Sequence, residues 1–297
     1  MGIVLGPNQY GKSENRVVRI YRDTARHEIR DLNVSTPLRG DFDAAHTIGD
    51  QSAVLPTDTQ KNTVFSFAKE QGITSIEEYA RALGEHFVDG TEAVSAARVE
   101  VEEYAWQRIE VDGAGHDHAF TRSRRRRRVR PSSPSTTRGS DRRTTVVSGL
   151  KDLVLAKTTG SEFHGFLTDR YTTLPETHDR ILATSLVARW RYDRTDVDWD
   201  TTYQSVRSLL LRQFAEAHSY ALQQSLYAMG EAALETHPEV AQIKFSAPNK
   251  HHFLVDLSPF GVDNPGEVFV AADRPYGLIE ATVQRDDTAD DPVAWHW

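Results

Sequence analysis

The same order of periodic segments occurs twice along this chain of 297 residues: two strands, two helices and two strands. In the first half, alternating apolar residues predict strands over 16–22 and 32–36, and helices follow Thr57 and Ser75. Ser75 is predicted to cap the second helix, whose apolar stripe comprises Ile76, Tyr79, Ala80, Leu83 and Phe87. After Gly90, alternation returns over residues 97–106. A change of phase near the end of that stretch predicts a β-bulge near Glu102.

The second half repeats this order from Val146 onwards. Its predicted elements are strands at 153–155 and 182–192, a helix after Asp200, a second helix capped by Ser219, and strands at 243–257 and 267–285. A repeated unit of this kind predicts an α+β fold in which each half is an antiparallel sheet with two helices on one face. We place the two domains at residues 1–145 and 146–297.

One segment breaks the pattern. Residues 121–143 hold ten arginines and one aspartate, a charge of +9, so the rest of the chain carries −8 − 9 = −17. We interpret 121–145 as an exposed loop or a disordered segment, because nothing in it can pack. A patch for nucleic acid or an acidic partner, and a locally altered reading frame, are the alternatives. The acidic remainder argues against a nucleic-acid-binding surface.

Composition excludes several kinds of site. The chain has no cysteine, so it has no disulfide, thiolate metal site or thiol nucleophile. No run of eighteen apolar residues and no signal peptide is present, and we expect a soluble, intracellular protein. His116 and His118 share a face of a predicted strand, but nothing completes the spacing of a known ligand set, so we predict no metal site.

The start of the helix at Thr57 is a candidate anion site. Thr57 and Gln60 have the spacing of a capping box, and the free N–H groups of a first helical turn stabilise negative charge. Lys12, before the first strand, is a base only if burial lowers its pKa. Each of these residues also has a purely structural explanation, as a helix cap or a solvated charge.

Three further candidates lie in the second half. Asn249 and His251 project to one face of a strand and can orient a small polar molecule and move a proton. Arg180 and Gln223 can together grip a flat ring that carries carbonyl and N–H groups, and Phe163 can stack on it. A polar strand end, a surface ion and a packed aromatic are the structural alternatives.

These pieces, in this order, resemble urate oxidase (uricase), a family with the tunnelling fold. The matching segments are NQYGK at 8–12, TDTQKNT at 57–63, HDHAF at 116–120, TGSEFHGFLTDRYTTLPETHDRIL at 159–182, LQQ at 222–224, PNKHHFLVDL at 248–257 and RPYGLIEATV at 274–283. Residues 121–146 depart from the family, which has strand there. The resemblance implies two tandem tunnelling-fold domains, each with a four-stranded antiparallel sheet.

The resemblance also implies an activity: oxidation of urate by O2 and water to 5-hydroxyisourate and hydrogen peroxide, without metal, flavin or any other cofactor. By motif match, Lys12 and Thr57 form the catalytic dyad and His251 completes a proton relay. The other matched positions imply substrate contacts: Thr57 and Asn249 to O2 or water, Arg180 and Gln223 to the ring edge, Phe163 beneath the ring, and the backbone N–H groups of Asp58 and Leu222.

The family further implies a homotetramer whose active sites lie between subunits, with no nucleic acid and no membrane as partner. The chain ends without the Ser-Lys-Leu peroxisomal signal, so we expect a cytoplasmic enzyme. Two other functions remain open at this point: a different tunnelling-fold enzyme acting on a purine or pterin, and a protein that binds nucleic acid or an acidic partner through Arg124–Arg128.

Overall fold

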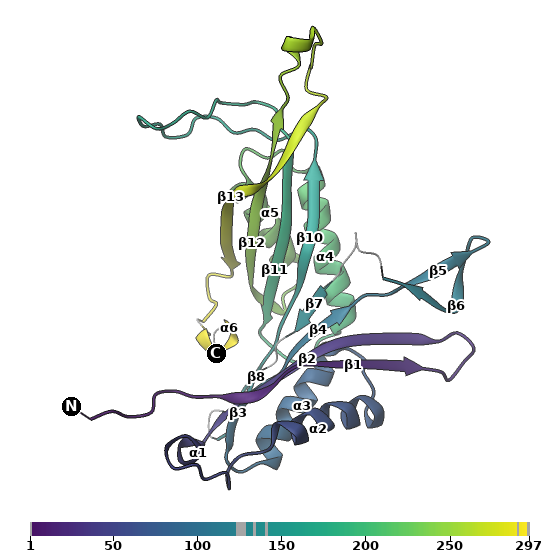
Figure 1. Ribbon diagram of the computed structural model, residues 1–297, viewed down its shortest axis with the longest axis vertical. Coiled ribbons are helices and arrows are strands. Elements are labelled where there is room, and N and C mark those ends of the chain that lie inside the picture. The colour runs from purple at the N-terminus through teal and green to yellow at the C-terminus, as the bar shows by residue number, and fades with distance from the viewer. Residues whose placement is uncertain (1, 123–128, 133–134, 140–141, 290, 296–297) are drawn as a thin grey trace. The chain divides into compact units, whose positions relative to one another are not determined.

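The computed structural model describes residues 2–122, 129–132, 135–139, 142–289 and 291–295 (Figure 1). It divides into two compact units. The first unit comprises residues 1–150, 190–203 and 289–297, and the second comprises 151–189 and 204–288. The predicted boundary between 145 and 146 remains a prediction, since the two units are built from interleaved parts of the chain.

The first unit is an antiparallel sheet covered by two helices. Its elements are β1 (Tyr10–Tyr21), β2 (Glu28–Gly40), α1 (Asp43–Thr47), α2 (Thr57–Glu70), α3 (Ile76–Gly90), β3 (Val94–Arg98), β4 (Glu100–Tyr104), β5 (Gln107–Val111), β6 (Ala114–Thr121), β7 (Val129–Ser132), β8 (Ser135–Thr137), β9 (Thr144–Thr145) and α6 (Pro292–Trp295). β1 pairs along one side of β2, while β3 and β4 pair with β2 in succession. β5 and β6 form a separate hairpin.

The pairing of β2 with β4 corrects one prediction. The register runs without a break from Leu32 opposite Glu103 to Ser35 opposite Glu100, so Glu102 is not a bulge. The irregularity lies between Arg39 and Gly40 instead.

The described part of the arginine-rich segment is also not a loop throughout. β7 pairs with β4, and β8 pairs with β3 and β9. Arg138 donates to the Glu92 carbonyl at 3.0 Å and Arg142 pairs with Asp89. These two side chains therefore bind the first unit itself. The run Arg124–Arg128 lies outside the described residues.

The core of the first unit follows the sequence pattern closely. Leu32, Val34 and Leu38 of β2 have no exposed surface, as expected for the inward face of a strand. The predicted stripe of α3 is buried at all five positions, Ile76, Tyr79, Ala80, Leu83 and Phe87. Ser75 caps this helix by accepting a hydrogen bond from the Glu78 N–H at 3.1 Å.

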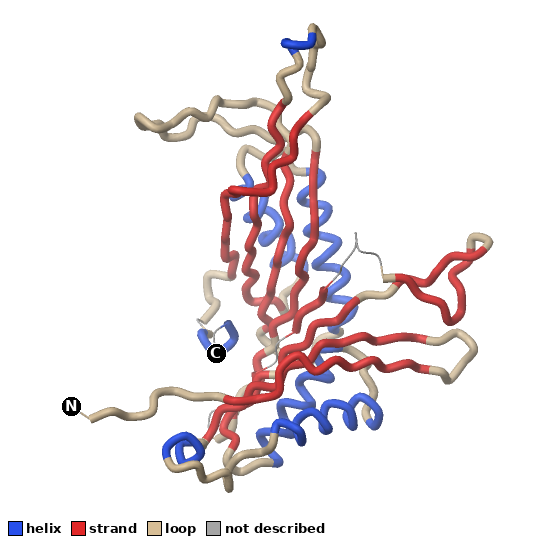
Figure 2. Tube along the Cα trace, in the orientation of Figure 1, coloured by secondary structure: helices blue, strands red, loops and turns tan. Residues whose placement is uncertain are grey.

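The second unit repeats the arrangement. Its elements are most of β10 (Val147–Lys157), β11 (Leu182–Tyr192) and α4 (Trp199–Glu216), together with α5 (Leu222–Thr236), β12 (Val240–Leu254), the 3-10 turn η2 (Ser258–Phe260) and β13 (Phe269–Gln284). Residues 147–150, 190–192 and 199–203 of the first three elements belong to the first unit. The strands lie in the order β13-β12-β11-β10, with α4 and α5 on one face (Figures 1 and 2). The predicted repeat of strands and helices is therefore confirmed.

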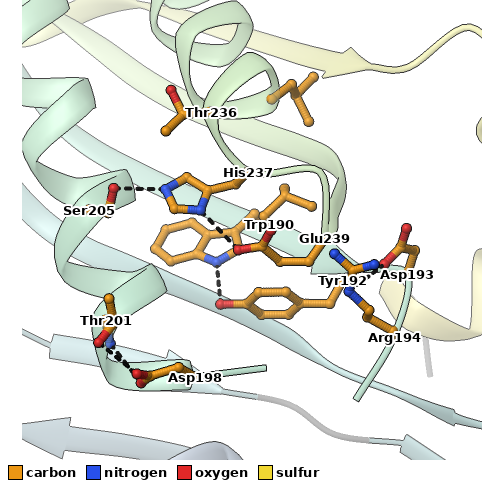
Figure 3. A network of polar contacts seen from close by, with 12 residues as sticks. Trp190, Tyr192, Asp193, Arg194, Asp198, Thr201, Ser205, Thr236, His237 and Glu239 are labelled. Atoms are coloured by element: carbon orange, nitrogen blue, oxygen red, sulfur yellow. Dashed lines mark hydrogen bonds and ion pairs between the residues drawn. The ribbon is translucent and has the colours of Figure 1, made fainter. Parts of the chain in front are cut away.

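A polar cluster closes the end of α5. His237 is the C-cap residue of the helix, and its backbone N–H donates to the Ala233 carbonyl. Its ring lies between Ser205, with Nε2 at 2.8 Å from Oγ, and Glu239, with Nδ1 at 2.9 Å from Oε1 (Figure 3). These contacts satisfy a nearly buried imidazole and join α4, α5 and the start of β12. Within the described ranges, no helix is long and apolar enough to cross a membrane.

Candidate active site

Lys12 occupies an unusual place in β1. β1 pairs regularly with β2 as far as Lys12, which lies opposite Thr36. The register then shifts, and pairing resumes at Asn15 opposite Val34. Ser13 and Glu14 thus oppose the single residue Ser35, which is a β-bulge, and Glu14 has a φ of 54°. This bulge turns the backbone immediately beside Lys12.

Gly11 allows the two strands to approach closely at this point. A Cβ on Gly11 would lie 2.2 Å from the Thr36 carbonyl oxygen, so a larger residue would force the strands apart. Lys12 itself is half-buried. Its ammonium has no hydrogen bond or ion pair among the residues that the structure describes, although it contributes to lowering the pKa of Asp58, after Lys61 and Asn62.

The Gln60 side chain binds the backbone of Lys12. Gln60 is therefore not part of a capping box with Thr57, and that prediction is wrong. Gln60 is fully buried, and its Oε1 accepts from the Lys12 N–H at 3.2 Å and from the Thr36 hydroxyl at 2.8 Å. Its Nε2 donates to the Leu55 carbonyl at 3.3 Å. The residue before the helix is Pro56, without a side-chain cap. Gln60 therefore links α2 to β1 and β2.

Thr57 and Asp58 form the open first turn of α2. Both are exposed, and the first intrahelical bond runs from the Gln60 N–H to the Pro56 carbonyl at 3.1 Å. The N–H groups before Gln60 are consequently unpaired by helix geometry, and they lie at the positive end of a helix of 14 residues. The Thr57 hydroxyl makes no hydrogen bond within the described residues, so it is available to a ligand.

In the second unit, the structure brings Phe163 and Arg180 together. Phe163 and Thr177 exchange backbone hydrogen bonds of 2.8 and 3.0 Å, and the Arg180 N–H donates to the Ser161 carbonyl at 2.9 Å. The Arg180 guanidinium carbon lies 5.2 Å from the centre of the Phe163 ring. Burial lowers the pKa of Arg180, but an arginine remains a cation at neutral pH.

Ser219 joins this pair to the start of α5, in a role other than the predicted helix cap. Ser161 and Ser219 form a parallel β-bridge, and the Ser219 hydroxyl bonds to the Ser225 hydroxyl at 2.7 Å. The N-cap residue is Ala221, and the helix starts at Leu222. Leu222 is buried and Gln223 is exposed in the first turn, where backbone N–H groups are again free.

Asn249 and His251 lie near the end of β12. β12 pairs regularly with β13 as far as Asn249 opposite Gly277, and pairing resumes at His251 opposite Ala272. The His251 ring stacks on Phe253 with centroids 5.7 Å apart, which agrees with the predicted alternation of side chains. The Asn249 and Gln223 side chains make no hydrogen bonds in the described part of the chain, so their polar groups are available.

The predicted residues thus form two groups, each inside one unit. Lys12, Thr57 and Asp58 belong to the first unit, whereas Phe163, Arg180, Leu222, Gln223, Asn249 and His251 belong to the second. Their catalytic and binding roles stay predictions.

Sequence reasoning missed the positioning roles of Gln60, Ser161 and Ser219. The helical spacing of Gln60 with Val64 and Ala68 could have indicated that Gln60 is buried, because the three residues form the buried stripe of α2.

The fold and these groups define a class before any particular family. Tandem α+β units, each with a sheet, two helices on one face and polar groups at helix starts and strand ends, are consistent with a tunnelling-fold protein that binds a small polar ring. The Uricase family model matches residues 8–130 and 146–280. The chain belongs to the uricase family.

Individual relatives agree with this assignment. Uricase from Arthrobacter globiformis is 56% identical over 293 residues, covering 99% of this chain and 94% of the relative. Uricase from Oryctolagus cuniculus is 38% identical over 93% of each chain. The crystal structure of the Arthrobacter globiformis uricase superposes with a TM-score of 0.93 over 99% of both chains. A uricase structure from Bacillus fastidious has a TM-score of 0.82 at 26% identity, covering 94% of each chain.

The family match also shortens the segment, predicted as 121–146, over which the sequence departs from the family. The family match continues to residue 130 and resumes at 146, so within the segment 121–146 it leaves out 131–145 alone. Neither the different purine or pterin enzyme nor the protein acting through its arginine run is favoured by these relatives.

Proposed function

We propose that this protein is a urate oxidase that catalyses the reaction urate + O2 + H2O → 5-hydroxyisourate + H2O2. The observation that carries the proposal is the 56% identity to a uricase over 99% of the chain. The matched segments include the residues with free polar groups, Thr57, Gln223 and Asn249. In this reaction the purine loses two electrons, dioxygen gains them to form peroxide, and water supplies the new hydroxyl group.

The second unit supplies the substrate clamp in this proposal. Arg180 donates hydrogen bonds in a planar fork and Gln223 both donates and accepts, so the two suit the carbonyl and N–H edge of a urate anion. Phe163 stacks against the ring, and the cation beside it favours the anionic substrate. The backbone N–H of Leu222, in the first turn of α5, adds a donor.

The first unit supplies the proton chemistry. Lys12 and Thr57 form a dyad that removes a proton from bound urate, which makes the dianion a stronger reductant toward O2. Thr57 and Asn249 hold O2 and then water over the ring. His251 completes the proton relay with the Lys12–Thr57 dyad. The Asp58 N–H and the helix N-terminus stabilise the negative charge that develops. No metal or organic cofactor has a role in this scheme.

The assembly is part of the proposal. We infer a homotetramer in which Lys12 and Thr57 of one subunit complete the site that Phe163, Arg180 and Gln223 form in another, and we infer a cytoplasmic location. The candidate residues of one chain fall into two groups, one in each unit. A subunit kept from assembling would then have no complete site.

The test is an assay with purified protein, urate and dissolved oxygen. Loss of urate absorbance should match peroxide formation one for one, stop under nitrogen, and continue after exhaustive chelation. Thr57→Ala and Lys12→Ala should reduce kcat by at least about a hundredfold with a smaller change in KM. Undiminished turnover in Thr57→Ala would remove the proposed dyad, and absence of peroxide would remove the proposed reaction.

A further inference from the structure

Glu162 is surrounded by three imidazole rings in the second unit. One carboxylate oxygen, Oε2, lies 2.9 Å from His164 Nε2 and 3.5 Å from His178 Nδ1. The other oxygen, Oε1, lies 2.5 Å from His218 Nε2. These histidines have no part in the proposed oxidation of urate, and the sequence pattern did not single them out.

The backbone explains why these side chains meet. They lie in and beside the long connection between β10 and β11 (Figure 1), where Phe163 and Thr177 form an antiparallel bridge. The neighbouring position of this bridge places Glu162 across from His178, and the two-residue period puts His164 on the same face as Glu162. A second bridge, between Ser161 and Ser219, brings the adjacent His218 to Glu162. Backbone pairing on both sides therefore fixes the cluster.

The spacing of the donor atoms suits a metal ion. Ligand atoms of Glu162, His164 and His178 all lie within 4.8 Å of one another. Two donors at about 2.1 Å from a tetrahedral zinc ion are about 3.4 Å apart, and the two distances from Oε2 bracket that value.

We propose that Glu162, His164 and His178 bind a divalent transition-metal ion such as Zn²⁺, with His218 orienting the carboxylate from its second oxygen. Three protein ligands leave a fourth position for water. Two imidazoles and one carboxylate favour Zn²⁺ over Mg²⁺ or Ca²⁺, which take oxygen ligands. The side chains are 16%, 38% and 74% exposed, in that order, so an ion can reach the site from solvent.

The bound ion would tie two segments of one connection together. Glu162 and His164 flank Phe163, and His178 lies two residues before Arg180, so the metal would restrain the segments that carry the proposed substrate clamp. This consequence rests on the proposed function, whereas the binding itself does not. The ion is a structural restraint here and takes no part in electron transfer.

The test uses the full-length, assembled protein after removal of metals with EDTA. Equilibrium dialysis against Zn²⁺ with elemental analysis should give one zinc per chain, and Mg²⁺ at the same concentration should not bind. His164→Asn with His178→Asn should weaken zinc binding by at least about a hundredfold, and His218→Asn by about tenfold or more. The matched control is His116→Asn with His118→Asn, because the ring centroids of that pair on β6 are 4.5 Å apart, the same distance as between His164 and His178.

A stability measurement separates a built site from casual surface binding. Zinc at a hundredfold excess over its Kd should raise the Tm of the wild type by about 5 °C or more, and should not raise that of the His164/His178 variant. Binding by that variant equal to the wild type, or loss of zinc in the control pair instead, would overturn the site. Persistence of urate turnover after EDTA treatment tests the cofactor-free reaction separately, since the binding data alone decide the site.

Discussion

Replacing Gln60 with Leu should damage both stability and turnover, although residue 60 touches no substrate in the proposed mechanism. The side chain is fully buried and accepts two hydrogen bonds at Oε1, from the Lys12 N–H and the Thr36 hydroxyl. Leucine has a similar size and no acceptor. The substitution therefore tests whether the buried amide is what fixes Lys12 relative to α2.

The magnitude follows from which groups lose a partner. The Leu55 carbonyl keeps its hydrogen bond from the Tyr10 hydroxyl at 3.0 Å, so losing Gln60 Nε2 leaves no unsatisfied acceptor there. The Lys12 N–H and the Thr36 hydroxyl do lose their partner, and the hydroxyl retains only a 3.5 Å contact with the Lys12 carbonyl. At about 1–3 kcal/mol for the buried, unsatisfied Lys12 N–H and about 1 kcal/mol for the Thr36 hydroxyl, which keeps its weak contact, the loss is about 2–4 kcal/mol.

A double-mutant cycle makes the explanation specific. Thr36→Val alone removes one hydrogen bond and should cost about 1 kcal/mol, but in the Gln60→Leu background it removes an unsatisfied hydroxyl and should be neutral or stabilising. Gln51→Leu is the control, because Gln51 is exposed and its side chain makes one hydrogen bond, of 3.3 Å to the Gly49 carbonyl. It should change stability by less than about 0.5 kcal/mol.

Stability is measured as Tm by calorimetry at one protein concentration, and activity as loss of urate absorbance. Gln60→Leu should lower Tm by about 5–15 °C and lower kcat more than it raises KM, since it displaces the dyad residue and not the clamp. The reasoning is refuted if Gln60→Leu resembles Gln51→Leu, or if Thr36→Val costs the same in both backgrounds.

Three other substitutions test the fold and the clamp. Gly230→Ala would place a Cβ 2.6 Å from Val283 Cγ2, so we expect it to destabilise the protein by about 1–3 kcal/mol. In a Val283→Ala variant the same substitution should cost less. Equal costs with Val283 and with Ala at 283, measured by urea denaturation, would show that Val283 is not the cause. Tyr79 donates to the Val64 carbonyl at 2.6 Å and burial raises its pKa, so its stabilising contribution is fully present below about pH 10 and is lost as pH rises above that value. Tyr79→Phe should therefore lower the free energy of unfolding by about 1 kcal/mol at pH 7, and this difference from the wild type should shrink above pH 10. Urea denaturation across this pH range measures the difference, and a constant value at all pH values would contradict this reasoning. Arg180→Lys keeps the charge but loses the planar fork, so KM for urate should rise at least about tenfold while Tm stays within a few degrees, and an unchanged KM would remove the clamp.

The sequence by itself determined where most strands and helices lie and to which family the chain belongs. The α3 stripe from Ile76 to Phe87 is buried at each predicted position, and the strand predicted at 182–192 has those same bounds. These features are local, because the period of apolar residues and the capping serine at 75 act over a few neighbouring positions. The long motifs carried the family resemblance in the same local way.

Only the tertiary structure decided which polar residues hold the candidate site. Gln60 was predicted as half of a capping box, but contacts with residues 12 and 36, far away in the sequence, make it a buried link between α2 and two strands. Ser219 bonds to Ser225 and bridges to Ser161 instead of capping α5. The histidines around Glu162 meet because two β-bridges join segments up to 58 residues apart, Ser161 with Ser219. A hydrogen-bonding side chain takes whichever partner the fold brings within about 3 Å, and pairing at that range is a property of the folded chain.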